Sequence, residues 1–426
     1  MAKPHHAVLP NPLCIGLDFG TSGARAHVID ANGNLIAQAH CSYDIHQWQS
    51  WLRALAWLFA TLPAPVRHRI KAIAIDGTSS TVLLCDETNT PLHPPQLYDD
   101  GRAWIEAERI AACAPRGHIA ASSTSSLAKL LYALKQPHAE APGYFTDQAS
   151  WLAAMLTGQP GCTDYHNALK LGYDAAARAW PDWMRPLGVK AYLPRVVTPG
   201  TLLGAVARAV ASKLDIPPAC YVRAGTTDSI AAFIASGAIT PGDAVTSLGS
   251  TLVLKLLSTK RVEDVRHGIY SHRFGSLWLA GGASNSGGAV LRQFFDDAAL
   301  ARLSRQIDPA CPSGLDYYPL PKTGERFPVN DPHLAPRLTP RPANEVQFLH
   351  GLLEGIARIE THGYALLAQL GATPVKRILS AGGGAQNESW RRLRERLLGV
   401  PVTPALHGEA AYGAARLAQY GDKLLS

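Results

Sequence analysis

The fold is decided by the segment 15–29, which reads Ile-Gly-Leu-Asp-Phe-Gly-Thr-Ser-Gly-Ala-Arg-Ala-His-Val-Ile. An apolar strand leads into a turn with two glycines, two hydroxyl side chains and the carboxylate of Asp18, and a second strand follows. A similar hairpin surrounds Ser247-Leu-Gly-Ser-Thr251. Two hairpins of this kind in one chain predict two related lobes.

The chemistry of these turns suits a polyphosphate. Glycine permits positive φ and a close approach of the backbone to a ligand. Turn amides and hydroxyl groups donate hydrogen bonds to phosphate oxygens. Asp18 would repel phosphate unless a cation lay between them, which indicates a nucleotide bound with Mg²⁺. Each turn alone is equally compatible with an ordinary β-hairpin, and it is the pair that favours the phosphate interpretation.

The composition indicates a globular protein of two domains. The chain has 426 residues, of which 47% are hydrophobic and 17% charged, and this length exceeds one ordinary core. The net charge of +7 is spread along the chain, without the basic stripe and interleaved aromatics of nucleic-acid binding. We therefore expect no nucleic-acid partner.

Cysteine usage and hydropathy indicate a cytoplasmic protein. The seven cysteines are an odd number, widely spaced and without a Cys-x-x-Cys pair, which disfavours disulfides and a zinc site. No apolar run approaches the roughly 18 residues of a membrane span. We expect residues 1–12 to form a frayed start, because they contain no sustained apolar stretch of a signal peptide.

Apolar segments with strand character alternate with helical patterns, which predicts an α/β protein with mixed sheets. The expected strands are 13–18, 70–76, 221–225, 244–248, 277–281 and 376–381, and the expected helices are 48–62, 127–134 and 346–370. Asn344 is suited to cap the last helix and Gly371 to end it. Gly351 and Gly355 inside this helix imply close packing by a neighbouring helix or the ligand. The segment 312–342 is expected on the outer face of the second lobe, as a functional or mobile connection.

Ala224-Gly-Thr-Thr-Asp228 is a strand end and a tight turn, followed by an alanine-rich helix. Asp228 is suited to act as a general base on a hydroxyl that attacks phosphorus, because phosphoryl transfer needs one acceptor for the proton of the nucleophile. The alternative is that Asp228 only caps the helix.

A third glycine turn, Gly382-Gly-Gly-Ala-Gln-Asn387, follows the strand that ends at Ser380. Consecutive glycines beside a helix N-terminus let the backbone lie against a planar or anionic ligand. Asn387 can contact a purine edge and Trp390 can flank the ring, although a helix cap and a core tryptophan would look the same. Gly281-Gly282 belongs to a similar strand-to-helix turn.

Two common nucleotide motifs do not occur. The chain has no Gly-x-x-x-x-Gly-Lys-Ser/Thr run, which excludes a P-loop of that class. The Gly-x-Gly-x-x-Gly pattern of dinucleotide-binding domains is not convincingly present either, which disfavours a dehydrogenase.

In chain order, these motifs resemble the FGGY carbohydrate kinases of the actin-like ATPase superfamily. The resemblance runs from about Ile15 to Leu417. It includes both phosphate hairpins, the Asp228 turn, the Gly382 turn and the closing segment Glu409-Ala-Ala-Tyr-Gly-Ala-Ala-Arg-Leu-Ala418, which is expected to be helical. The resemblance implies two actin-like, ribonuclease H-like lobes with mixed sheets, helices and a deep cleft between them. The sugar-binding lobe would comprise 1–235 plus 409–426, and the ATP-binding lobe 236–408.

The resemblance also implies roles for single residues. Asp228 would be the catalytic base, Asp18 would orient the sugar or hold hydrated Mg²⁺ through water, and Ser79 would help to bind the sugar. Thr21 would also be a catalytic residue. The residues expected to bind ATP are Gly20, Thr21, Gly249, Ser250, Thr251, Gly282, Gly383, Gly384, Asn387 and Trp390.

Within the family, the chain resembles compact D-ribulokinases that were often labelled xylulose kinase by similarity. The finer likeness is carried by Asp76-Gly-Thr-Ser-Ser-Thr-Val-Leu-Leu-Cys85, by the segment 122–129 and by the segment 164–172. Xylulose kinases usually have Gly-Gln-Met-His where this chain has Gly77-Thr-Ser-Ser80. The family's Trp-x-Asp-x-Arg becomes Tyr98-Asp-Asp-Gly-Arg102.

We therefore expect a cytoplasmic, Mg²⁺-dependent kinase that transfers the γ-phosphate of ATP to the C5 hydroxyl of a free ketopentose, with D-ribulose favoured. D-Xylulose is the nearest alternative substrate. An actin-like ATPase that acts as a nucleotide-dependent binding or chaperone protein is the alternative from another class. The expected assembly is a monomer or a homodimer.

Overall fold

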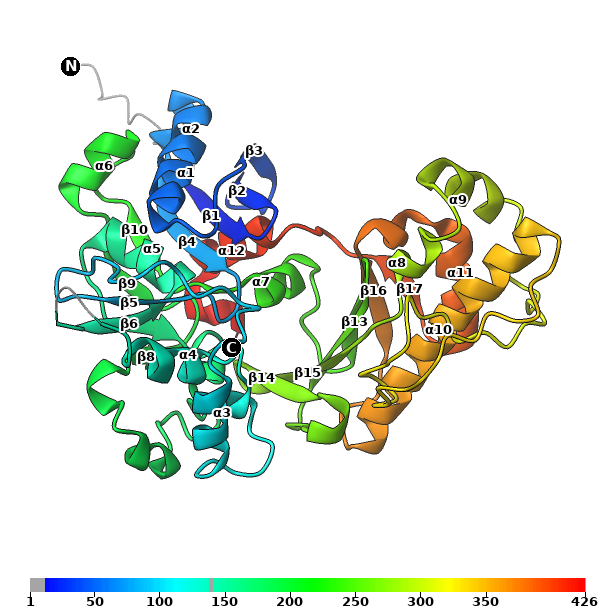
Figure 1. The fold of residues 1–426 in the computed structure, drawn as a ribbon. Helices are drawn as coiled ribbons and strands as arrows, with labels where there is room; N and C mark the ends of the chain where they lie inside the picture. Colours follow the sequence, from blue (N-terminus) through cyan, green and yellow to red (C-terminus); the bar gives the residue numbers. More distant parts are fainter. Residues whose placement is uncertain (1–11, 138–140, 426) are drawn as a thin grey trace, which may run out of the picture. The chain divides into compact units, whose positions relative to one another are not determined.

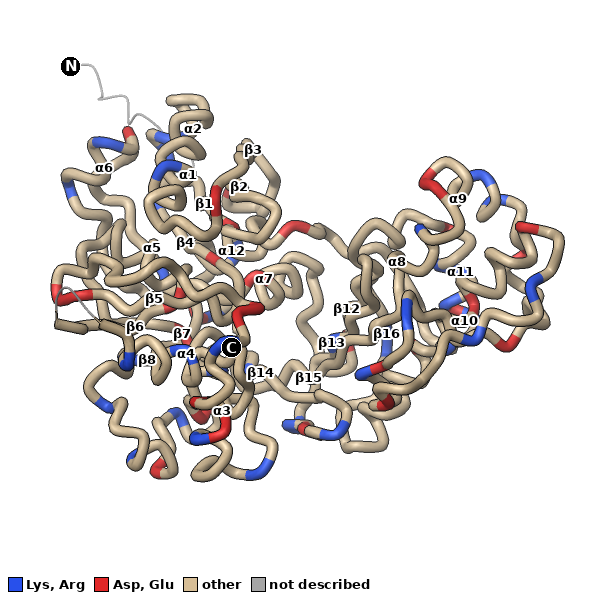
Figure 2. The backbone as a smooth tube through the Cα atoms, in the orientation of Figure 1, with Lys and Arg blue, Asp and Glu red and all other residues tan. Residues whose placement is uncertain are grey.

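The computed structural model describes residues 12–137 and 141–425, and its chain divides into two compact units (Figure 1). The first unit comprises Met1–Ala235 and Glu409–Ser426, and the second comprises Ser236–Gly408. Of the start expected to be frayed, residues 1–11 lie outside the described residues. Among the described residues, no helix is long and apolar enough to cross a bilayer. Lys and Arg are interspersed with Asp and Glu along both units (Figure 2).

The first unit is built on a seven-stranded mixed sheet of order β3-β2-β1-β4-β10-β9, in which β11 also pairs with β4. β1 runs antiparallel to β2 and parallel to β4. The strands are β1 (Leu13–Gly20), β2 (Gly23–Ile29), β3 (Leu35–Cys41), β4 (Ile70–Gly77), β9 (Leu202–Ala205), β10 (Tyr221–Arg223) and β11 (Thr226–Thr227).

Helices cover both faces of this sheet, and the alternation of β1 decides which side chain meets which helix. Ile15 and Leu17 enter the core with α1 (Trp48–Thr61) and α5 (Gln148–Thr157). Gly16 points to the opposite face, where a Cβ would lie 2.1 Å from the carbonyl oxygen of Ala411 in α12 (Ala410–Tyr420). Asp18 has the parity of Gly16, so it points to the face covered by α12 and α7 (Asp228–Ala235).

The remainder of the first unit surrounds this sheet. Two small two-stranded sheets pair β5 with β6 and β7 with β8. Their bounds are β5 (Val82–Cys85), β6 (Tyr144–Asp147), β7 (Cys162–Asp164) and β8 (Arg195–Val197). The other helices are α2 (Ala64–Arg67), α3 (Trp104–Ala111), α4 (Ser126–Ala133), α6 (Arg208–Leu214), η1 (Ile119–Ala121), η2 (Ala168–Leu171), η3 (Asp182–Leu187), η4 (Lys190–Tyr192) and η7 (Gly421–Leu425).

The second unit is built on a six-stranded mixed sheet of order β14-β15-β13-β12-β16-β17. Its strands are β12 (Asp243–Leu248), β13 (Leu252–Ser258), β14 (Tyr270–Phe274), β15 (Leu277–Ser284), β16 (Arg377–Ala381) and β17 (Val402–Pro404). Its helices are α8 (Gly288–Leu291), α9 (Asp297–Ser304), α10 (Glu345–Gln369), α11 (Glu388–Leu398), η5 (Val265–His267) and η6 (Gly383–Gln386).

The two sheets share one plan. The path β3-β2-β1-β4-β10 is antiparallel, antiparallel, parallel and parallel. The path β15-β13-β12-β16-β17 repeats these directions in the same order. The β1–β2 hairpin of the first unit therefore corresponds to the β12–β13 hairpin of the second, as the two related turns in the sequence predict.

The expected strands and the three expected helices are present, with small shifts at their ends. Asn344 caps α10 through its Oδ1, which accepts the N–H of Val346 at 2.8 Å. Gly371 follows the end of α10 with φ of +97°. The closing segment expected to be helical forms α12.

The close packing expected at Gly351 and Gly355 is confirmed, but the neighbour is the segment 312–342 and not another helix. A Cβ at Gly351 would lie 2.7 Å from Leu315, and one at Gly355 would lie 2.8 Å from Pro319. The expectation that this segment lies on the outer face is wrong, because Tyr317 and Phe327 belong to the core of the unit. Within a proline-rich sequence, these apolar residues could not be recognised as part of the core.

Candidate active site

Three carboxylates lie together at the carboxyl-terminal edge of the first sheet. Asp18 near the end of β1 and Asp76 near the end of β4 are direct partners in the parallel register. Asp228 opens α7 directly after β11, whose Thr226 pairs with Asp76. The carboxyl ends of neighbouring parallel strands form a common edge, where open α/β sheets bind ligands.

Burial raises the pKa of two of these acids. Asp76 is fully buried and Asp18 is 5% exposed. Burial, and then the charges of Asp18 and Asp228, raise the pKa of Asp76 well above its usual range. Burial is also the main cause that raises the pKa of Asp18 to about 6. Neither oxygen of Asp76 accepts a hydrogen bond from the described residues, so the two carboxyl groups interact best when they share one proton.

Two cations lie beside the acids. Arg25 Nη1 is 3.3 Å from Asp18 Oδ2, and Arg25 Nε is 3.4 Å from Glu409 Oε2. Burial lowers the pKa of Lys170, whereas the negative charge of Asp228 raises it. Asp228 is half-buried, and its Oδ1 accepts the N–H of Ser229 at 2.6 Å. Asp228 thus contacts the first turn of α7, and it also lies beside Lys170 and the acids Asp18 and Asp76.

Gln148 joins the turns that follow β1 and β4. Its Oε1 accepts from both the N–H and the hydroxyl of Thr78, each at 3.2 Å. Its Nε2 donates to the hydroxyl of Tyr43 at 3.3 Å, and that hydroxyl donates to the carbonyl of Gly20 at 2.8 Å. The buried Gln148 therefore holds the hairpin carrying Thr21 in fixed relation to the turn carrying Ser79.

The sequence analysis missed Asp76 and Gln148 as site residues. Asp76 had a usable signal, because an acid at the end of the second buried parallel strand must lie beside Asp18. Gln148 had none, since it begins α5 far along the chain. Among the expected residues, Gly20, Thr21 and Ser79 all lie near the acids through these two turns, with Thr21 exposed and Ser79 half-buried.

In the second unit, the β12–β13 hairpin borders a cavity of about 720 Å³. The expected ATP-binding residues that line it are Gly249, Ser250, Gly383, Gly384, Asn387 and Trp390. The wall also includes Arg292 and Arg305, two cations that were not predicted from the sequence, and the acids Asp297 and Glu388. A glycine-lined cavity with guanidinium groups on its wall suits a polyphosphate.

Asn387 and Trp390 have the structural roles that the sequence also allowed, a helix cap and a buried tryptophan, and both line the cavity. Asn387 caps α11, because its Oδ1 accepts the N–H of Trp390 at 3.0 Å, and its Nδ2 donates to Ser304 Oγ at 2.8 Å. Trp390 is 2% exposed and donates through Nε1 to the carbonyl of Leu353 at 3.1 Å. Both residues thus have structural duties and still line the cavity.

The glycines of this region serve different purposes. A Cβ at Gly383 would meet nothing within 4 Å, whereas one at Gly384 would lie 2.6 Å from the Trp390 ring. Gly282 does not line the cavity, because its open side is filled by the Phe327 ring, 2.4 Å from a Cβ at that position. Thr251 belongs to the hairpin turn but is not part of the cavity wall. The structure therefore brings six of the ten expected ATP-binding residues together at this cavity. Thr251 and Gly282 do not line it, and Gly20 and Thr21 belong to the first unit.

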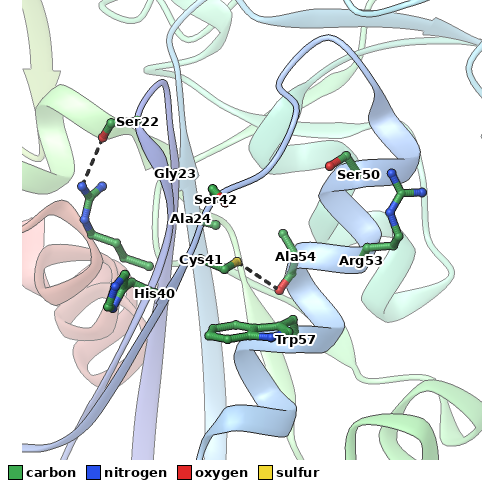
Figure 3. A pocket seen from close by; sticks show the side chains of 11 residues that line it. Ser22, Gly23, Ala24, His40, Cys41, Ser42, Ser50, Arg53, Ala54 and Trp57 are labelled. Atoms are coloured by element: carbon green, nitrogen blue, oxygen red, sulfur yellow. Dashed lines mark hydrogen bonds between the residues drawn. The ribbon is translucent and has the colours of Figure 1, made fainter.

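A second cavity, of about 670 Å³, lies at the open end of the β2–β3 hairpin (Figure 3). Its polar side chains do not converge. His40 lies on one side of the hairpin, and Arg53 and Trp57 of α1 lie on the other (Figure 3). The register agrees, since His40 pairs with Arg25 whereas the neighbouring Cys41 is directed to α1.

Comparison with protein families gives two matches. Residues 13–235 match the FGGY family of carbohydrate kinases, N-terminal domain, and residues 244–421 match its C-terminal domain. Among curated relatives, a xylulose kinase of Streptomyces coelicolor is 27% identical over 95% of this chain and 87% of its own length. A gluconokinase of Bacillus subtilis is 22% identical over the same shares of the two chains.

Solved structures show the same fold. A xylulose kinase from Brucella ovis superposes with a TM-score of 0.84 at 23% identity, covering 96% of this chain and 90% of the other. A gluconate kinase from Lactobacillus acidophilus gives a TM-score of 0.82 at 17% identity, covering 98% and 90%. Since the two family domains together match almost the whole chain, the protein belongs to the FGGY family of carbohydrate kinases, which are phosphotransferases with an alcohol group as acceptor.

Proposed function

We propose that this kinase phosphorylates a free ketopentose at its C5 hydroxyl and that D-ribulose is the favoured substrate. The observation that carries the substrate is the turn after β4, Gly77-Thr78-Ser79-Ser80, where the resembling xylulose kinases have glutamine, methionine and histidine. Small hydroxyl side chains leave more room and offer hydrogen bonds to sugar hydroxyls. Ser79 is half-buried in this turn and would contact the sugar.

D-Xylulose is the second candidate, and the names of the relatives favour it. Several of the similar kinases are xylulose kinases, and the two sugars differ by one inverted hydroxyl. The distinction between the two epimers therefore depends on where a single hydrogen-bonding group lies in the sugar pocket.

The acids of the first unit have complementary tasks in this reaction. Asp228 would accept the proton of the attacking hydroxyl, because a positioned carboxylate is the usual acceptor in such transfers. Lys170 would balance the charge beside Asp228. Arg25 would hold the carboxylate of Asp18 in place, and Asp76 would form a hydrogen bond with it.

Asp18 fits a role toward hydrated Mg²⁺. Its Oδ1 is buried and accepts no hydrogen bond from the described residues, so the oxygen is available to a water ligand of the ion. No group of three or more His, Cys, Asp or Glu side chains in the described part of the chain is arranged to hold a metal ion by itself. When bound, Mg²⁺ neutralises phosphate charge during transfer.

ATP fits the cavity of the second unit. Gly249 and Ser250 would contact its phosphates through the hairpin turn, Arg292 and Arg305 would face the same charge, and Gly383 would allow the close approach of the nucleoside. At about 720 Å³, the cavity has the size of ordinary ligand sites. Thr251 would act indirectly by shaping the hairpin turn, and Gly282 by leaving room for the Phe327 ring.

A cytoplasmic location agrees with the chemistry of the thiols. All seven cysteines are free, as is usual in a reducing compartment. For the assembly, a monomer or a homodimer remains our expectation.

A coupled ADP-release screen over ketopentoses, ketohexoses, pentitols and glycerol tests the function. We expect release to rise at least tenfold with D-ribulose, and kcat/KM for D-ribulose to exceed that for D-xylulose. A higher kcat/KM for D-xylulose would assign the protein to the second candidate. ATP hydrolysis that is indifferent to every sugar would instead favour an actin-like ATPase that acts through a binding partner. Identification of the product as a 5-phosphate completes the assignment.

A further inference from the structure

Lys129 is a fully buried lysine that none of the steps above uses. It lies in α4, and its exposed fraction is 0%. No carboxylate of the described residues forms an ion pair with it, and burial lowers the pKa of its amino group to about 7. A lysine is among the residues least often found fully buried, because its charge loses hydration there. A methionine would fill the same space without this cost.

The amino group of Lys129 joins two backbone segments. Nζ donates to the carbonyl of Ser80 at 2.8 Å and to the carbonyl of Leu97 at 2.5 Å. Gln96 closes the arrangement, because its Nε2 donates to the carbonyl of Lys129 itself at 3.2 Å. An amino group is well suited to this task, since it carries three donors on one atom.

The first of these segments is the turn after β4. Ser80 has φ of +64°, a left-handed conformation that is uncommon for residues other than glycine. A second contact from α4 supports it, because Ser126 Oγ donates to Ser80 Oγ at 3.1 Å. The helix therefore holds in place the residue that follows Ser79, the proposed sugar contact.

The second segment is the loop that follows Leu97. It carries Asp100 and Arg102, which pair with each other at 2.9 Å and belong to the motif shared with the family. Asp100 lies within electrostatic range of Lys129, since its charge raises the pKa of the lysine. Lys129 is thus bound both to the turn that carries Ser79, the proposed sugar contact, and to the loop that carries Asp100 and Arg102.

We propose that Lys129 is a positioning residue for the sugar. Its amino group sets the separation between the turn that carries Ser79 and the loop that carries Asp100 and Arg102. Two epimeric ketopentoses differ only in the direction of one hydroxyl, so this separation decides which of them finds its hydrogen-bond partners. The inference rests on the proposed function, because it concerns the same sugar.

The test replaces Lys129 by methionine, which has similar length and no donor. Purified full-length wild type and Lys129→Met are compared for kcat and KM with D-ribulose, D-xylulose and ATP, and for the melting temperature. We expect KM for the preferred sugar to rise at least tenfold and the ratio of kcat/KM between the two sugars to change at least fivefold. KM for ATP should stay within twofold. Lys213→Met, at an exposed lysine of α6 in the same unit, is the matched control and should behave as wild type.

Two results would overturn the role of Lys129. One is an unchanged sugar preference and sugar KM in Lys129→Met. The other is an equal loss toward sugar and ATP that follows the fall in melting temperature, as a merely structural residue would give. If Lys129→Met does not fold, Ser126→Ala removes the second contact to Ser80. It should change the preference in the same direction, and an unchanged preference would contradict the inference.

The wild type separates this inference from the proposed function. Absence of sugar-dependent ADP release in the wild type contradicts the proposed function itself, and the role of Lys129 is rejected with it. Sugar-dependent release in the wild type, together with an unchanged preference in the variant, contradicts only the role of Lys129.

Discussion

Asp18 and Asp76 lie side by side on β1 and β4 as partners in the parallel register, and both are buried. Burial raises the pKa of both carboxyl groups. An acid pair of this kind needs only one of its members for contact with a ligand. The other sets the charge and orientation of the first.

Asp76→Asn should reduce the pH dependence of stability, because it removes a carboxyl group whose pKa is raised well above its usual range in the folded protein and leaves Asp18 as the acid of the pair that titrates. The pKa of Asp18 is raised from 3.8 to about 6 in the folded protein, so the native state holds the proton that the unfolded chain releases. This stabilises the wild type fully below pH 4, and the stabilisation is lost as pH rises through 6. The shift of about 2 units corresponds to at most about 3 kcal/mol.

Denaturant unfolding between pH 4 and 7.5, together with the pH dependence of kcat/KM, measures this effect. In Asp76→Asn, the free energy of unfolding should fall less as pH rises, whereas the acid limb of kcat/KM should stay near pH 6, because the amide can replace the hydrogen bond by which Asp76 lowers the pKa of Asp18. An identical pH dependence of stability in wild type and variant would show that Asp76 does not hold a proton in the native state.

Asp228→Asn should lower kcat by about 10² to 10⁴, because the amide cannot accept the proton of the attacking hydroxyl. Dissociation constants for sugar and ATP should remain within about threefold, as measured by calorimetry. Asp182→Asn, at an exposed position of η3, is the control and should leave kcat unchanged. Full turnover in a folded Asp228→Asn variant would remove the residue from the role of base.

Arg394→Met should destabilise the second unit by about 3–5 kcal/mol, because it leaves Glu360 buried without its partner. Arg394 Nε and Glu360 Oε2 are 2.6 Å apart, and both side chains are 0% exposed. Denaturant unfolding measures the loss. Arg392→Met breaks an exposed pair with Glu388 and should change stability by less than about 1 kcal/mol. Equal effects of the two substitutions would contradict the importance of burial.

Gly383→Ala should weaken ATP binding at least tenfold without affecting the nucleotide-free protein. The new methyl group meets nothing within 4 Å in the protein itself, so it would occupy only space that the nucleotide needs. Calorimetric titration with ATP and the melting temperature without ATP test the two halves of this statement. Gly408→Ala, also without neighbours within 4 Å and outside the cavity, is the control. Unchanged ATP affinity would exclude Gly383 from the nucleotide site.

The sequence predicted features whose signals are local. The β1–β2 hairpin, the cap of α10 at Asn344 and the turn before Asp228 each follow from adjacent residues, and each is present. The structure could not be predicted where distant segments meet. The core residues Tyr317 and Phe327 lie within a stretch rich in proline, so nothing nearby in the sequence indicated that Gly351 and Gly282 are packed by that stretch.

The candidate site shows the same division. Asp18, Ser79 and Gly383 stand in turns with recognisable composition. Gln148 and Lys129 act through hydrogen bonds to segments 32 to 105 residues away in the chain, and no local pattern reveals such contacts. Their types were also misleading, because a glutamine and a lysine are ordinarily surface residues.

The position of α12 has a consequence for biosynthesis. This helix contacts both β1 and α7, and its Gly413 leaves no room for a side chain, since a Cβ would lie 1.8 Å from the carbonyl oxygen of Ala231. The first unit therefore cannot complete its interior until residues 410–420 have left the ribosome. The second unit is one uninterrupted stretch of chain and can reach its native state earlier, so the half that is translated first would mature last.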